Sequence, residues 1–169
     1  MTRRPFVHAT ILALAALALA ACGAATLTLA VPDLTIPADS TAGTVCYARG
    51  EATTRLGIRH ATYDAVATYR ANALIGTSTA VDVVVYGRSS APSATCVTVG
   101  PDDRPLGGPF TLEADTPQDV TVGAGDAGSE LAALVRGGSY WLGVSLDAGF
   151  TLGGERSITF EEGRVRVRF

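Results

Sequence analysis

The stretch ITFEEGRVRVRF, residues 158–169, carries apolar side chains at alternate positions on both sides of a Glu-Gly pair. Period-two alternation of this kind is typical of strands that bury one face. Two residues that include a glycine, set between two such runs, predict a β-hairpin. With Glu162 and Gly163 as the turn, Phe160 faces Val165 across the two strands. The stretch therefore predicts antiparallel β structure.

The basic residues of the same stretch form a stripe. In the hairpin register Glu161 faces Arg164, while Arg164, Arg166 and Arg168 share one face. The chain has a formal net charge of −3, which argues against nucleic acid or anionic lipid as a partner. We expect the stripe to solvate the terminal strand and to discourage edge-to-edge pairing.

Alternation continues through most of the chain. Further runs lie at residues 26–31, 44–49, 81–88, 96–99, 110–114, 119–122 and 140–146, with Gly-, Pro- and Asp-rich stretches such as 101–109 between them. Hydrophobic residues make up 47% of the chain and charged residues 17%, which excludes a disordered protein. The spacing predicts one all-β domain, an immunoglobulin-like or jelly-roll β-sandwich of about eight strands.

Residues 58–72 are compatible with two structures. As a strand, they place Ala61, Tyr63, Ala65 and Tyr69 on one face, whereas the helical alignment of their apolar residues is less complete. We interpret this segment as a long, bulged strand.

A glycine-rich segment, GAGDAG at residues 123–128, precedes the helix-like sequence SELAALVR. The glycine spacing resembles a dinucleotide-binding fingerprint, with Asp147 about 20 residues further on. The strand before it alternates with polar Asp119 and Thr121, whereas a central parallel strand is apolar on both faces. We therefore expect a loop followed by one short helical crossover, and no nucleotide site.

The beginning of the chain divides like an export signal. Arg3 and Arg4 precede an apolar run at residues 9–21, which is too short to span a bilayer. The run ends in LAAC, residues 19–22, which resembles the lipobox of bacterial lipoproteins. An ordinary secretory signal peptide and twin-arginine export are the alternatives.

The lipobox resemblance implies lipid attachment at Cys22 and anchoring to a membrane. It divides the chain into a signal peptide at residues 1–21, a short tether at 22–26 and the β-sandwich at 27–169. It also implies a bacterial cell-envelope location, on the outer side of a membrane.

Assigning Cys22 to lipid leaves Cys46 and Cys96 as a pair. Disulfides persist outside the cytoplasm, so we expect these two cysteines to be bonded, with two free buried thiols as the alternative. No cysteine spacing indicates a catalytic thiol or a zinc site.

Aromatic residues give the candidate binding site. Alternation along residues 140–146 turns Trp141 away from the core, beside small neighbours, and Tyr86 likewise shares an outward face with Arg88. We expect Trp141, Tyr86 and Arg88 to bind a carbohydrate or protein ligand, unless a loop covers the indole. Residues 120–146 also resemble, in outline, the late part of jelly-roll carbohydrate-binding modules.

Other polar residues give weaker patterns. His60 and Asp64 share one strand face but lie four residues apart, too far for direct contact on an extended chain. Asp126 with Glu130, or Asp102 with Asp103, supply carboxylates without a calcium-binding spacing.

These residues lead us to expect no catalytic residue, no metal and no cofactor. The function predicted is that of a non-enzymatic binding or structural module in the envelope. An envelope-associated hydrolase is the alternative.

Overall fold

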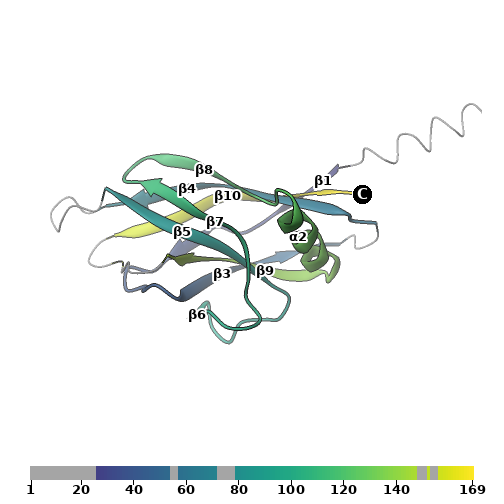
Figure 1. Cartoon of the computed structure of the whole chain (residues 1–169), viewed down its shortest axis with the longest axis horizontal. Helices are drawn as coiled ribbons and strands as arrows, with labels where there is room; N and C mark the ends of the chain where they lie inside the picture. Colours follow the sequence, from purple (N-terminus) through teal and green to yellow (C-terminus); the bar gives the residue numbers. More distant parts are fainter. Residues whose placement is uncertain (1–25, 54–56, 72–78, 148–151, 153–155) are drawn as a thin grey trace, which may run out of the picture.

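The computed structural model describes residues 26–53, 57–71, 79–147, 152 and 156–169 (Figure 1). These residues form β1 (Thr26–Ala30), β2 (Leu34–Ile36), β3 (Thr44–Glu51), β4 (His60–Arg70), β5 (Ala80–Arg88), β6 (Cys96–Thr98), β7 (Arg104–Glu113), β8 (Pro117–Val122), α2 (Asp126–Arg136), β9 (Ser139–Leu146) and β10 (Ser157–Arg168). Within the described residues, no helix is long and apolar enough to cross a membrane. The leader and Cys22 lie outside the described residues.

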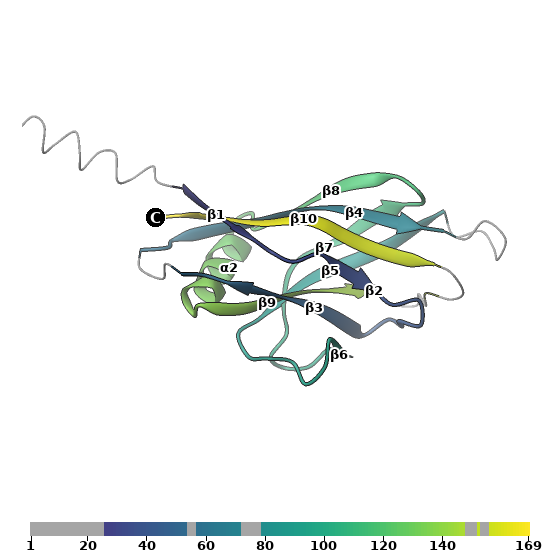
Figure 2. The ribbon, with the colours of Figure 1, turned by 180° about the vertical axis from the view of Figure 1, so that it is seen from behind.

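The strands form two antiparallel sheets packed face to face, as alternation predicts (Figures 1 and 2). The first sheet has the order β1-β10-β4-β8, with β2 also paired to β10, and the second has the order β6-β3-β9-β5-β7. The all-β sandwich with a short helix is therefore confirmed. The described residues form ten strands, where about eight were expected. β2 has no counterpart among the predicted runs, because three residues are too few to show alternation, and β7 is longer than expected, because it begins inside the predicted loop 101–109.

The hairpin predicted at Glu162 and Gly163 is wrong. Residues 157–168 form one strand, β10, whose pairing with β4 shifts by one residue between Glu161 and Arg164. Two consecutive residues, Glu161 and Glu162, face outward there, and Glu162 takes a positive φ of 55°. This β-bulge moves the buried face from even-numbered to odd-numbered positions, so that Phe160 and Val165 both reach the core.

The expected role of the arginine stripe is also wrong. Arg164, Arg166 and Arg168 are exposed, as predicted, but β10 is paired on both sides and is not an edge strand. The stripe therefore lies in the middle of the outer face of the first sheet, where Arg166 pairs with Asp64 on β4 at 3.5 Å.

The strand interpretation of residues 58–72 is confirmed by β4. Its pattern alternates along all 11 residues, with Ala61, Tyr63, Ala65 and Tyr69 buried. The bulge expected within this segment lies instead in its partner β10.

The short crossover helix is confirmed as α2, which connects β8 of the first sheet to β9 of the second. It lies at one end of the sandwich (Figure 1) and buries Leu131, Ala132 and Val135. The strand before the glycine-rich segment is an antiparallel edge strand, unlike the central parallel strand of a dinucleotide fold.

The predicted disulfide joins Cys46 on β3 to Cys96 on β6. The two residues lie directly opposite each other in the antiparallel ladder, with their Cα atoms 4.0 Å apart. The bond fastens β6, which has only three residues, to the edge of the second sheet.

Three of the buried tyrosines, Tyr63, Tyr69 and Tyr140, belong to the core between the sheets. The fully buried ring of Tyr140 lies against Gly50, where a Cβ would be 2.3 Å from ring carbons. Burial raises the pKa of Tyr140 to about 12. Burial is also the main cause of the raised pKa of Tyr63, with a smaller contribution from Asp33.

We expect alkali to destabilise the fold through Tyr140. Its phenol ionises near pH 10 in the unfolded chain but near pH 12 in the folded protein, so its stabilising contribution is complete below pH 10. As the pH rises from 10 towards 12, the free energy of unfolding falls by up to about 1.4 kcal/mol per pH unit for this proton. Urea titrations of the wild type and Y140F measure the effect. If the free energy of unfolding falls equally steeply with pH in the two proteins, the prediction is wrong.

Candidate functional site

Trp141 lies on the outer face of the second sheet, between two arginines. On β9 it is paired with Arg49 of β3 on one side and Arg88 of β5 on the other. All three side chains point away from the core, as alternation predicts for Trp141 and Arg88. The Arg49 guanidinium lies over the indole, 5.8 Å from the ring centroid, which is within the range of a cation–π contact.

A second row, two residues along β9, has Gly143 at its centre, with Tyr47 on β3 and Tyr86 on β5 as its pairing partners. A Cβ at Gly143 would lie 2.5 Å from carbons of the Tyr47 ring. Because Gly143 has no side chain, the Tyr47 ring can lie over β9 and need not extend perpendicular to the sheet from β3.

Tyr47, Asp103 and Arg88 form a buried polar cluster. The Tyr47 hydroxyl donates a hydrogen bond to Asp103 Oδ1, and the backbone N–H of Gly100 donates to Asp103 Oδ2 at 2.7 Å. Arg88 pairs with Asp103 at 3.2 Å and with Asp102 at 3.1 Å, and its guanidinium lies 5.6 Å from the Tyr47 ring centroid. Burial, followed by the hydrogen bond to Asp103, raises the pKa of Tyr47.

This cluster holds the segment between β5 and β7 against the sheet. Within this segment β6 pairs with β3 at the edge of the second sheet, and Figures 1 and 2 show that the segment lies on the side of that sheet away from β8 and β4. It covers Val45, Tyr47 and Ser145 on the outer face, and each of these is buried. The second sheet is therefore covered on both faces at this end of β3.

A groove opens where this cover stops. Tyr47, Arg49 and Trp141 line it from the sheet, and the loop residues Ala91, Pro92, Ala94 and Thr95 line it from the other side. The hollow has a volume of about 400 Å³. Its lining combines two aromatic rings, one guanidinium and small side chains, a set of groups suited to stacking and hydrogen bonding with a ligand.

The three predicted ligand-binding residues have different surroundings. Trp141 is half-buried and lines the groove, whereas Tyr86 is half-buried on the far side of Gly143 and does not line it. Arg88 is engaged by two carboxylates, so it fastens the covering segment and has little capacity left for a ligand.

Sequence reasoning missed Tyr47 and Arg49, and it considered Asp103 for calcium and not as the partner of Tyr47 and Arg88. Two signals were available in the sequence. Tyr47 and Arg49 occupy alternate, outward positions of one predicted strand, and Gly143 leaves room for a neighbouring side chain on the outward face of another. Connecting them requires the strand order β3-β9-β5, which no local pattern contains.

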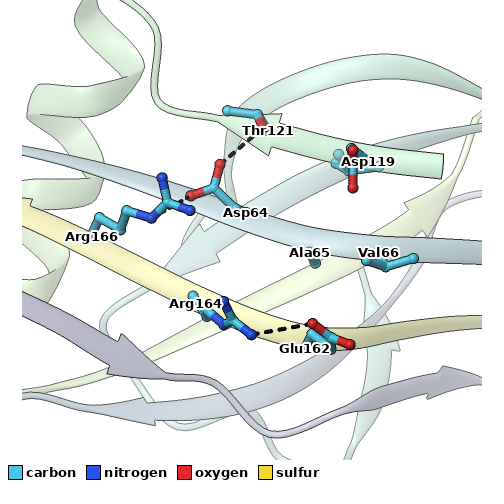
Figure 3. Close-up of a pocket in the computed structure, with 9 residues that line it drawn as sticks. Asp64, Ala65, Val66, Asp119, Thr121, Glu162, Arg164 and Arg166 are labelled. Atoms are coloured by element: carbon cyan, nitrogen blue, oxygen red, sulfur yellow. Dashed lines mark hydrogen bonds and ion pairs between the residues drawn. The ribbon is translucent and has the colours of Figure 1, made fainter.

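A second hollow, of about 270 Å³, lies on the first sheet beside the β10 bulge (Figure 3). Its charged groups largely pair with one another: Arg166 with Asp64 at 3.5 Å, and Arg164 with Glu162 at 3.2 Å. Asp64 also accepts a hydrogen bond from Thr121 at 2.9 Å. Asp119 adds one carboxylate without an arginine partner in this lining, but the two arginines are already engaged and exposed to solvent, so the hollow offers no free cationic group to a ligand.

Hydrolase geometry is not assembled around His60. The imidazole lies against α2, since a Cβ at Gly128 would be 2.1 Å from His60 Nε2, while Asp64 is engaged by Arg166 and Thr121. Among the described residues, no hydrogen bond joins His60 to a carboxylate or a serine, and no cluster of His, Cys, Asp or Glu has the size needed to hold a metal. Asp102 and Asp103, considered above for calcium, instead bind Arg88.

No protein-family model and no curated protein matches this chain. Among solved structures, it is similar to the IBDV viral particle, with a TM-score of 0.42 and 11% identity over 86% of this chain and 31% of that chain. It is also similar to the Gx strain of infectious bursal disease virus, with a TM-score of 0.39 and 9% identity over 85% and 32% of the two chains. The Gt strain gives a TM-score of 0.40 and 13% identity over the same shares. This chain spans about a third of the length of each.

Proposed function

We propose that this protein is a lipid-anchored binding module of a bacterial cell envelope and that it has no catalytic activity of its own. Its ligand, a carbohydrate or a protein, binds in the groove at Trp141. The observation that carries this proposal is the outward-facing indole, which lies in cation–π contact with Arg49 and is flanked by a loop held in place by a disulfide and a buried ion pair. Such a preformed surface binds without first paying the cost of ordering a loop.

The anchor is proposed from the sequence alone. Cleavage before Cys22 and acylation of its thiol would leave only a few residues before β1, which begins at Thr26. The domain would then lie close to the membrane. Intact mass of the protein extracted in detergent tests this: we expect a chain that begins at Cys22 with added acyl mass. A chain cut elsewhere, or without acyl mass, would remove the anchor from the proposal.

We expect Trp141 to report ligand binding directly, because it is the only tryptophan in the chain. Polysaccharide fragments and peptides prepared from bacterial envelopes are titrated against its fluorescence. For any fraction that changes the emission, W141A should weaken binding by at least about tenfold in calorimetry, because stacking on the indole is lost.

R168A is the matched control, since Arg168 is exposed on the first sheet, away from the groove. Its affinity should equal that of the wild type. If no fraction alters the fluorescence, or if W141A binds as tightly as R168A, the groove is not the binding site.

A further inference from the structure

We infer that the groove takes an extended peptide, which adds as a strand to the free edge of β3. This inference rests on the proposed function and specifies its ligand. The occupant is a peptide segment of another protein with a basic residue two positions before an acidic one. It lies antiparallel to β3, beside Arg49 and Glu51.

The edge of β3 is open over only part of its length. β9 pairs with β3 from Val45 to Glu51, whereas β6 pairs with it only from Thr44 to Cys46, followed by one bond from the N–H of Tyr47 to the C=O of Thr95 at 2.8 Å. Beyond Tyr47, no described strand lies on that side of β3.

The backbone groups at the open edge point outward. In an antiparallel ladder, alternate residues direct their N–H and C=O groups to opposite sides. Tyr47 bonds towards β6, and Ala52 bonds in the other direction, donating to the C=O of Gly138 on the β9 side at 2.7 Å. Arg49 and Glu51 therefore direct theirs to the side of Tyr47, where the described residues supply no backbone partner.

The charges at this edge select the peptide. The side chains of Arg49 and Glu51 are 57% and 68% exposed, and in the free protein they pair with each other at 2.8 Å. An antiparallel strand places one residue opposite Glu51 and, two positions later, another opposite Arg49. Opposite charges in such cross-strand pairs are favourable and like charges are unfavourable, which predicts the order basic, any residue, acidic.

The edge and the groove form one surface, because Arg49 belongs to both. The peptide side chain opposite Arg49 lies at the mouth of the hollow between Trp141 and the loop residues Pro92 and Ala94. Backbone hydrogen bonds would supply affinity and the groove would supply selectivity, as in other complexes formed by strand addition. A second copy of this chain is a poorer occupant. Only Arg49 and Glu51 offer backbone groups at the open edge, and pairing with two residues buries far less surface than a stable dimer needs.

Hydrogen exchange of the full chain and a set of short peptides test the inference. In the free protein, the amides of Arg49 and Glu51 should exchange rapidly, whereas those of Ala48 and Gly50 should be protected. The probe is acetyl-Thr-Lys-Val-Glu-Thr-amide, whose Lys and Glu are designed to lie opposite Glu51 and Arg49. Its binding should change Trp141 fluorescence and slow exchange at Arg49 and Glu51.

Matched peptides separate strand addition from other binding. Methylation of the Glu amide of the probe removes a donor to β3 and should weaken binding by about tenfold, whereas methylation of the Val amide, which points away from β3, should not. Exchanging the Lys and Glu of the probe should weaken binding by about fivefold. On the protein side, E51P should abolish binding and E51T should retain most of it, since only proline lacks the N–H and it is tolerated at a strand edge.

Several results would overturn the inference. Equal effects of the two methylations would show that the peptide does not bind as a strand. Protection of Arg49 and Glu51 that grows with protein concentration would show that a second copy occupies the edge. If polysaccharide fragments bind at Trp141 and peptides do not, the proposed function stands without strand addition. If neither class binds, both fall.

Discussion

R88M is expected to lower the free energy of unfolding by about 3–5 kcal/mol, because it leaves the buried carboxylate of Asp103 without its counter-charge. The Asp103 side chain is 1% exposed and that of Arg88 is 12% exposed, so solvent cannot replace the lost partner. Asp103 also accepts hydrogen bonds from Tyr47 and Gly100, and these hold it in place after the substitution. Urea denaturation at neutral pH measures the loss.

Two further variants isolate the cause. R49M removes another arginine from the same sheet face, where it is exposed, and should change stability by less than about 0.5 kcal/mol. R88M/D103N should recover part of the loss, since asparagine keeps oxygen and amide groups at the site without a buried charge. A loss below about 1 kcal/mol in R88M would show that the ion pair is not needed to hold the covering segment.

Removing the disulfide with C46A/C96A should also cost about 4 kcal/mol, because the bond closes a loop of 50 residues in the unfolded chain. The groove should change as well, since Thr95 and Tyr47 adjoin the two cysteines and line it. Denaturant titration gives the stability, and Trp141 emission reports the groove. Reduction of the wild type should reproduce both effects. If reduction leaves the stability unchanged, the bond contributes nothing to the fold.

The strand faces could be predicted from the sequence because burial follows a period of two along each strand. His60 to Arg70 shows this most clearly, with every second side chain buried. The outward positions of Trp141 and Tyr86 followed from the same rule.

The error at β10 has a definite origin. Phe160 and Val165 are both apolar, but one has an even number and the other an odd number, so the buried face must change between them. A turn and a bulge both achieve this change. The choice between them depends on pairing with β4, about 100 residues earlier in the chain, which no local pattern reveals.

The candidate site could be predicted only in part, for a related reason. Alternation gives the direction of a side chain but not its neighbours on adjacent strands. Arg49 contacts Trp141, and Tyr47 contacts Arg88, because β9 lies between β3 and β5. That order is a property of the whole fold. The sequence therefore predicted Arg88 as a ligand-binding residue, whereas its carboxylate partners could be found only in three dimensions.

The bulge in β10 also determines which kinds of mutation this strand can accept over evolution. Substitutions at Glu161 and Glu162 change side chains that face solvent, and many are expected to be neutral. Loss of one of these two residues would remove the bulge and leave a regular strand, in which every paired residue keeps its partner on β4 and its face of the sheet. Loss of a residue elsewhere in the strand, with the bulge kept, would instead exchange core for solvent on one side of the deletion. Changes of length that survive selection in this strand should therefore cluster at the bulge.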